Sequence, residues 1–217
     1  MDMNIVGIFL TVALAHFLAL LSPGPDFVIV VKSAMKNDSK KAIGVAAGIA
    51  TANALYIILC LVGVGAILAS SALVLIALKV IGGLFLIYLA IQALRAKKSD
   101  YVNLSIESVK VKCSDTTFTK EFITGFMSGI LNPKNLLFYL SLFTVVLTND
   151  VSFMFKVALG LWMTLVVFFW DVAIIFILSS NKVRKQFTKI SYYIDKITGA
   201  ILGTIGFTIV RSAFTKQ

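Results

Sequence analysis

Six long apolar segments alternate with shorter polar segments along the chain. They cover residues 4–31, 42–69, 73–94, 122–147, 151–180 and 197–210. A helix needs about 20 consecutive apolar residues to cross the hydrocarbon core of a bilayer, and only the last segment is clearly shorter. The pattern predicts an all-α polytopic membrane protein with six transmembrane helices, which form one membrane domain over residues 1–217.

Composition supports a membrane environment. Hydrophobic residues make up 59% of the chain, charged residues make up 14%, and the mean hydropathy is +0.97. A soluble domain is usually 45–50% apolar. The charges cluster between the apolar segments, because a charge at the bilayer centre costs several kcal/mol. We therefore expect the lipid bilayer as a partner and no nucleic acid, despite the net charge of +10, since no large water-facing surface is predicted.

The basic residues predict an orientation. Fifteen of the 20 Lys and Arg residues follow the first, third and fifth segments, and none lies at 70–72 or 148–150. The positive-inside rule places the three basic loops in the cytosol and both termini outside a bacterial cytoplasmic membrane. The long polar stretch 96–120 is then a cytosolic linker between two halves, about 1–95 and 121–217. The apolar N-terminus has no preceding basic residue and is interpreted as the first span rather than a signal peptide.

The two halves share a short pattern. Ala15, Ala19 and Ser22-Pro23 correspond to Gly125, Gly129 and Asn132-Pro133 at a constant offset of 110 residues. Three spans in each half make the halves antiparallel. The pattern predicts an inverted repeat in which the first helix of each half is broken at proline.

The two breaks contain all three prolines of the chain, in Ser22-Pro23-Gly24-Pro25-Asp26 and in Asn132-Pro133-Lys134-Asn135. Proline removes a backbone donor and displaces the preceding turn of a helix. The freed backbone groups need partners, so a break is tolerated only inside the protein or beside water. A simple kink is the alternative, but two breaks at corresponding positions favour a binding site near the bilayer midplane.

Several motifs carry a family resemblance. They are Leu21-Ser22-Pro23-Gly24-Pro25, the stretches 44–49 and 78–92, Gly125, Asn132-Pro133-Lys134 and Phe138. With these motifs in the same order along the chain, the protein resembles the LysE/RhtB superfamily of amino-acid exporters, nearer the homoserine/threonine branch. The resemblance implies six spans, inverted repeats and efflux driven by the proton motive force. It does not imply the substrate, because wider relatives move metal ions or electrons.

Asp171 is the strongest candidate for a functional ionisable residue. It lies in the fifth apolar segment with no other charge within ten residues. An intramembrane carboxylate is a functional-site hypothesis by default, and burial favours its neutral form, so we expect a proton-coupling role. The family resemblance implies the same, since homoserine/threonine-type members often have an aspartate here. The alternative is a structural ion pair with Lys134 or Lys79.

The predicted substrate-binding residues surround the breaks. A half-helix N-terminus suits a substrate carboxylate, and Lys134 adds a charge or pairs with Asp171. Asp26 is predicted either to hold a substrate ammonium or to cap the following helix. Asn53 is a site residue or an interhelical hydrogen-bonding group, and His16 is interpreted as packing. The full set is Pro23, Gly24, Pro25, Asp26, Asn53, Asn132, Pro133, Lys134 and Asn135.

Three glycine pairs at four-residue spacing predict close helix approach. They are Gly44–Gly48, Gly125–Gly129 and Gly199–Gly203. Such steps serve contacts within one chain or between copies. A homo-oligomer is therefore one expected assembly.

Together these features predict a secondary exporter of amino acids or similar small zwitterions. Divalent cation efflux is the first alternative, but it requires a cluster of carboxylates, histidines or thiolates. A transmembrane electron carrier or membrane enzyme is the second, and it requires reactive groups near the breaks. Cys60 and Cys113 do not lie there. We expect no enzymatic activity, no cofactor and no metal site.

Overall fold

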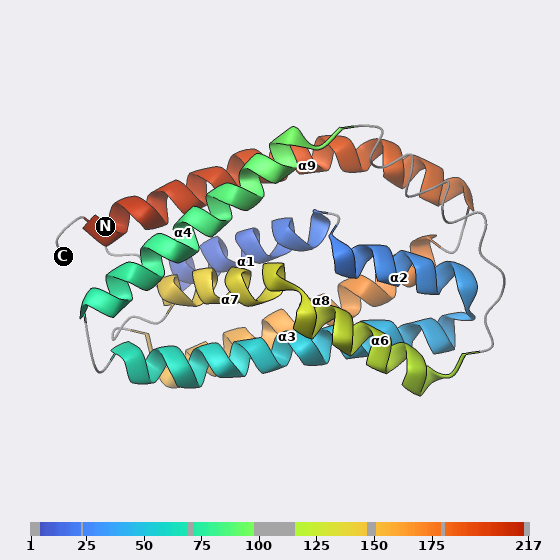
Figure 1. The fold of residues 1–217 in the computed structure, drawn as a ribbon, viewed down its shortest axis with the longest axis horizontal. Coiled ribbons are helices and arrows are strands. Elements are labelled where there is room, and N and C mark those ends of the chain that lie inside the picture. Colours follow the sequence, from blue (N-terminus) through green and yellow to red (C-terminus); the bar gives the residue numbers. More distant parts are fainter. Residues whose placement is uncertain are drawn as a thin grey trace.

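The computed structural model describes residues 5–22, 24–68, 72–97, 116–146, 151–178 and 181–214. All regular structure in these residues is α-helical, as predicted, and the helices lie roughly along one long axis (Figure 1). The helices are α1 (Ile5–Leu21), α2 (Pro25–Lys36), α3 (Ser39–Leu68), α4 (Ala72–Arg95), α6 (Phe118–Leu131), α7 (Pro133–Val146), α8 (Phe153–Leu178) and α9 (Asn181–Phe214).

Several helices are long and apolar enough to cross a membrane. Within the described residues these are Ser39–Gly63 of α3, Phe153–Ile177 of α8 and Tyr192–Phe214 of α9. The pair α1 and α2 passes the same test only when taken together, bent by 54°, which is the geometry of a broken span or of a re-entrant loop. The prediction of a polytopic helical membrane protein is thus confirmed.

The last apolar segment was predicted too short. Helix α9 begins at Asn181, and its apolar part begins at Tyr192 rather than at residue 197. Basic and aromatic residues are accommodated at a membrane interface without ending a helix. Hydropathy therefore marks where a helix enters hydrocarbon and not where helical structure starts.

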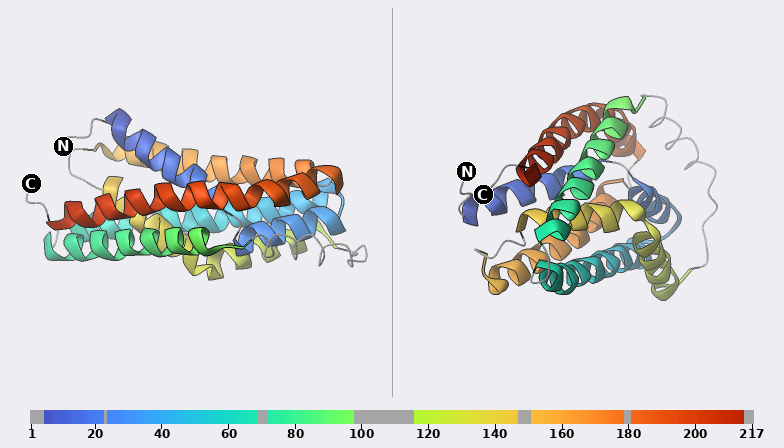
Figure 2. Two further views of the ribbon diagram at one scale, coloured as in Figure 1. Left: turned by 90° about the horizontal axis from the view of Figure 1, so that it is seen from above. Right: turned by 60° about the vertical axis from the view of Figure 1, so that its left-hand side comes forward.

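The helix ends alternate between the two ends of the molecule. Helices α2, α4 and α8 end toward one end of the long axis, and α3, α6 and α9 begin there (Figures 1 and 2). Helices α3, α7 and α9 end toward the other end, where α1 begins. The helix ends that flank the three predicted basic connections therefore lie toward one end, and those that flank the two predicted uncharged connections lie toward the other.

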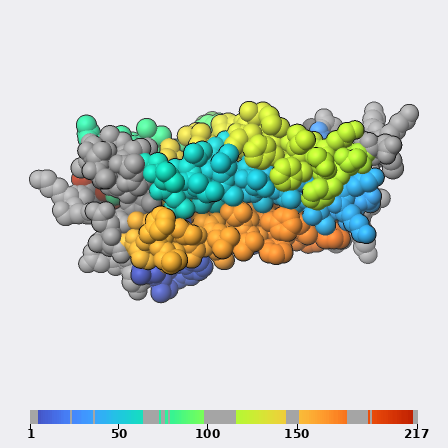
Figure 3. Space-filling model, turned by 90° about the horizontal axis from the view of Figure 1, so that it is seen from below, coloured from blue at the N-terminus to red at the C-terminus, as the bar shows by residue number. Residues whose placement is uncertain are grey.

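Glycine steps bring α3 and α6 into backbone contact, and α3 lies between α6 and α8 (Figure 3). A methyl group added at Gly48 would overlap the carbonyl oxygen of Phe122, and one added at Gly125 would overlap that of Val45. On α9, a Cβ at Gly199 would come within 2.8 Å of the carbonyl oxygen of Ala90 on α4. The glycine pairs thus serve contacts within the chain.

Buried side chains form two apolar clusters, and large apolar side chains also cover the outside. One cluster joins α1, α4, α7 and α9 with the second half of α3 and the first half of α8, and the other joins α2 with the first half of α3 and the second half of α8. Residues such as Leu10, Ile58, Leu161 and Phe207 are 54–63% exposed. An apolar surface of this extent fits contact with lipid rather than water.

Both predicted helix breaks are present. Helix α1 ends at Leu21 and α2 begins at Pro25, preceded by Gly24 in an extended conformation. Helix α6 ends at Leu131, Asn132 is extended, and α7 begins at Pro133. Proline at the first helical position costs no intrahelical hydrogen bond. The two breaks lie close to the middle of the long axis (Figure 1), whereas Pro23 lies outside the described residues.

Candidate functional site: a cavity between two broken helices

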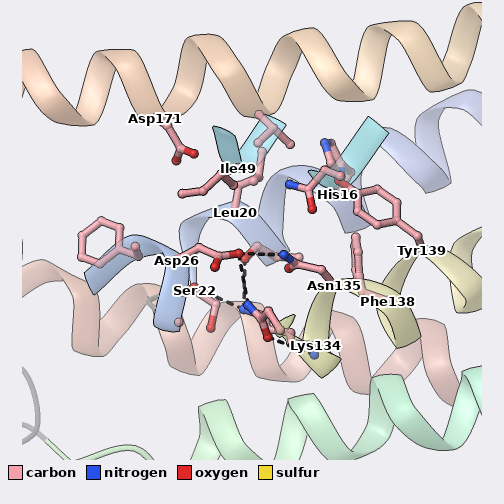
Figure 4. A pocket seen from close by; sticks show the side chains of 16 residues that line it. His16, Leu20, Ser22, Asp26, Ile49, Lys134, Asn135, Phe138, Tyr139 and Asp171 are labelled. Atoms are coloured by element: carbon pink, nitrogen blue, oxygen red, sulfur yellow. Dashed lines mark hydrogen bonds between the residues drawn. The ribbon is translucent and has the colours of Figure 1, made fainter. Parts of the chain in front are cut away.

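A cavity of about 60 Å³ lies beside the two breaks. Side chains from both apolar clusters line it, including Ile49 and Val167 from one and Phe138 and Tyr139 from the other. By the usual requirement of roughly 10–15 Å³ per water, it has room for a few water molecules. Seven predicted site residues line it (Figure 4): Gly24, Asp26, Asn53, Asn132, Lys134, Asn135 and Asp171.

Asp26 joins the first break to the second. The Ser128 hydroxyl donates to its Oδ1 at 2.5 Å. The side-chain amides of Asn132 and Asn135 donate to its Oδ2 at 3.1 and 2.7 Å. Its carboxylate therefore makes contacts across the chain and no capping bond, and Gly24 occupies the N-cap position of α2. The capping role that the sequence left open is wrong.

Lys134 joins the second break to the end of α1. Its Nζ donates to the carbonyl oxygens of Ala19 and Ser22, both at 3.4 Å. The last carbonyl groups of a helix lack intrahelical partners and carry partial negative charge, so the partly buried ammonium of Lys134 is stabilised there. A Cβ at Gly24 would lie 3.3 Å from this Nζ, so glycine leaves room for it.

The backbone of the second break is held locally. The Asn132 side-chain oxygen accepts a hydrogen bond from the Lys134 backbone N–H at 3.0 Å. This bond satisfies one of the free N–H groups at the start of α7. Asn132 thus holds the start of α7 with its side-chain oxygen and binds Asp26 with its side-chain nitrogen.

Asp171 faces the cavity from α8. The residue is 7% exposed, and its Oδ2 has no hydrogen-bond partner. Figure 4 shows Asp171 and Lys134 on opposite sides of Asp26. Among the described residues Asp171 forms no ion pair with Lys134 or Lys79, so the structural alternative finds no support.

His16 both packs and lines the cavity. Its Nε2 lies 3.2 Å from the carbonyl oxygen of Met163, and its ring lies 6.0–6.2 Å from those of Phe138, Tyr139 and Trp162. Its Nδ1 is buried without a partner. The packing role inferred from sequence is thus confirmed by the ring contacts, but His16 also lines the cavity.

Other polar residues were missed or placed differently. Ser128 binds Asp26 but was not singled out, although it lies one helical turn before Asn132 on the same face. Asp195 is buried on α9 outside the cavity lining. Pro25 and Pro133 begin helices rather than line the cavity. No group of three or more His, Cys, Asp or Glu side chains gathers anywhere in the described part of the chain.

Comparison with known proteins agrees with this geometry. The family model described as LysE type translocator matches residues 17–213. The threonine efflux protein of Escherichia coli K12 is 26% identical over 206 residues, which are 94% of this chain and 98% of that protein. The threonine efflux protein of Salmonella typhi is 27% identical with the same coverage.

An uncharacterized membrane protein of Haemophilus influenzae is 25% identical over 95% of this chain and 98% of its own length. No solved structure matches the chain. The family match covers most of the helical bundle, including both breaks and the carboxylate on α8. The chain therefore belongs to the LysE type translocator family of membrane transporters and is not an enzyme.

Proposed function

We propose that this protein is a secondary exporter that moves amino acids or similar small zwitterions out of the cell, driven by the proton motive force. The observation that carries the proposal is the cavity between the two breaks, which is lined by Asp26, Lys134 and Asp171. Ionisable groups in a membrane interior are costly and mark substrate or ion pathways. A zwitterion needs partners of both signs, and this set supplies them.

The named relatives support a small amino acid as the substrate. Two relatives that align over 94% of this chain are called threonine efflux proteins. Threonine carries an ammonium, a carboxylate and a hydroxyl group on a compact skeleton. We infer that threonine or an amino acid of similar size is the natural cargo.

The proposed architecture is six crossings in two inverted halves, about 1–95 and 121–217. Helix α4 and the broken pair α6–α7 serve as the third and fourth crossings. This alternation is supported by the helix ends that flank the three basic connections, which lie toward the same end of the bundle. By the positive-inside rule that end faces the cytosol, and both termini face outward. A second copy of the chain remains a proposed partner.

Neither alternative function gains support from the described residues. They contain no cluster of three potential metal ligands, as a dedicated divalent-cation site would require. Cys60 lies in an apolar cluster away from the cavity lining, and Cys113 lies outside the described residues. An electron carrier with a thiol near each break is therefore not favoured.

An accumulation assay tests the proposal. Cells are loaded with a dipeptide that releases threonine, and internal and external threonine are followed with and without the protein. The wild type is expected to lower internal threonine, and Asp171→Asn to abolish that effect at equal membrane abundance. Asp38→Asn, a change at an exposed residue, serves as the control. No difference from empty cells across a broad amino-acid panel would contradict the proposal.

A further inference from the structure

The cavity wall carries three buried polar atoms without partners: His16 Nδ1, Asn53 Oδ1 and Asp171 Oδ2. The Nε2 of His16 faces a carbonyl oxygen, which can only accept a hydrogen bond. Nε2 therefore carries the proton, and Nδ1 of the neutral ring is an acceptor. All three atoms accept hydrogen bonds and none donates.

Three of the donor groups around the same cavity are already engaged. The amides of Asn132 and Asn135 bind Asp26, and the ammonium of Lys134 binds the end of α1. A buried acceptor without a donor costs free energy, so an occupant that supplies donors is favoured. An ammonium group brings three donors and a positive charge.

Only one of the three free acceptors can carry a negative charge, namely Asp171. The other nearby carboxylate, Asp26, has donors on both oxygens. We propose that the ammonium of the outgoing solute and the coupling proton bind the same carboxylate, Asp171, and exclude each other. This inference rests on the function proposed above and gives it a coupling mechanism.

The exchange balances in protons and charge. In the outward-facing state the carboxylate takes a proton from external water and becomes a carboxylic acid. In the inward-facing state the solute ammonium binds, and this proton leaves to cytosolic water, so only an O–H bond is made and broken. Each cycle moves one zwitterion out and one proton in. A membrane potential of 100 mV then supports a roughly 50-fold solute gradient.

Other titratable groups could in principle carry the proton, so the test must separate them. Among the described residues they are His16 of α1, Asp26 of α2, Tyr56 of α3, and Lys134 and Tyr139 of α7. His16→Gln removes the imidazole and Asp26→Asn removes the other carboxylate, which are two alternative proton carriers that line the cavity. Asp171→Glu keeps a carboxylate on α8.

The first measurement uses purified protein with threonine as the probe, in weak buffer with a pH indicator. The wild type is expected to release about one proton per threonine bound, and its affinity falls by up to about tenfold per pH unit on the acid side. Asp171→Asn loses both effects, whereas Asp171→Glu, His16→Gln and Asp26→Asn keep proton release. Proton release that survives in Asp171→Asn would overturn the inference.

If Asp171→Asn does not bind threonine, its lack of proton release is uninformative, and infrared difference spectroscopy of the wild type then tests the inference. In the wild type, threonine is expected to abolish the band of a protonated carboxyl group. That band is absent in Asp171→Asn and present in Asp26→Asn. The analogue 3-hydroxybutyrate, which lacks the ammonium, should leave the band in place. A band that persists with threonine bound would contradict shared binding.

The two failures are distinguishable. If wild-type cells export no amino acid, the proposed function itself fails. If they export threonine while Asp171 keeps its proton with threonine bound, only the shared-carboxylate mechanism fails.

Discussion

At the scale of single residues, the charges at the breaks are held by neutral partners rather than by each other. Asp26 accepts from three uncharged donors, and Lys134 donates to two backbone carbonyl groups. Hydrogen bonds of this kind stabilise a charge in a low-dielectric site without closing an ion pair. The charges of Asp26 and Lys134 are therefore satisfied within the protein, and Asp171 is the cavity-lining carboxylate with an oxygen left for a passing solute.

Asp26→Asn tests the link between the breaks. The new amide nitrogen would face the donors of Ser128, Asn132 and Asn135, so hydrogen bonds are lost on one side of the side chain. We expect a loss of about 1–3 kcal/mol in stability and reduced export. Thermal unfolding in detergent measures the first effect and threonine accumulation the second.

Asp38→Asn is the matched control for this change. Asp38 is exposed at the start of α3, where it accepts from the backbone N–H of Lys41. Asparagine caps a helix about as well as aspartate, so stability should stay near that of wild type. An Asp26→Asn protein that unfolds at the wild-type temperature would show that the cross-break network stabilises nothing.

The sequence identified most cavity residues but not their pairings. Proline and polar side chains at the breaks indicated Asp26, Asn132, Lys134 and Asn135. Their partners are more than 100 residues away in the chain, as in the bond between Asn135 and Asp26. Periodicity gives the face of a helix but not the helix opposite, so Ser128 and the inward face of His16 could not be found in this way.

At the scale of helices, the lengths and breaks followed from hydrophobicity and proline, whereas the packing did not. The glycine pairs indicated close approach, but only the structure shows that Gly48 and Gly125 lie against the α6 and α3 backbones respectively. The start of α9 was missed because helix formation continues into the polar interface. The residue at which the helix begins and the residue at which it enters the membrane are therefore different.

Gly48→Ala tests this contact. The added methyl group would overlap the Phe122 carbonyl oxygen, so α3 and α6 must separate. Overpacking of this kind costs about 1–3 kcal/mol, and we expect a lower unfolding temperature and reduced export. Gly63→Ala on the same helix is the control, since nothing lies within 4 Å of an added Cβ there. Equal unfolding temperatures for the two variants would contradict close α3–α6 packing.

At the scale of the whole molecule, the helix ends that flank the predicted basic connections lie toward one end of the bundle. Length and charge pattern were enough to predict this arrangement. Tertiary contacts decide the angle between α1 and α2, and they decide which apolar residues, such as Leu10, stay exposed on the outside. Sequence pattern alone does not specify these.

Cysteine labelling tests the proposed orientation. Single cysteines replace Lys40 or Phe214 in a protein in which Cys60 and Cys113 are changed to alanine. A membrane-impermeant maleimide is expected to label Phe214→Cys but not Lys40→Cys in intact cells. In inverted vesicles the pattern should reverse. Labelling of Lys40→Cys from outside would contradict cytosolic basic loops.

The most direct test of the central claim is whether the solute passes through the cavity between the breaks. Leu20 lines this cavity, whereas Leu14 on the same helix is 47% exposed on the outside. In the cysteine-free protein, a small cationic thiol reagent should inactivate threonine export by Leu20→Cys, and threonine should slow that reaction. Leu14→Cys should react, if at all, without protection by threonine. Equal reaction of Leu20→Cys with and without saturating threonine would contradict the account.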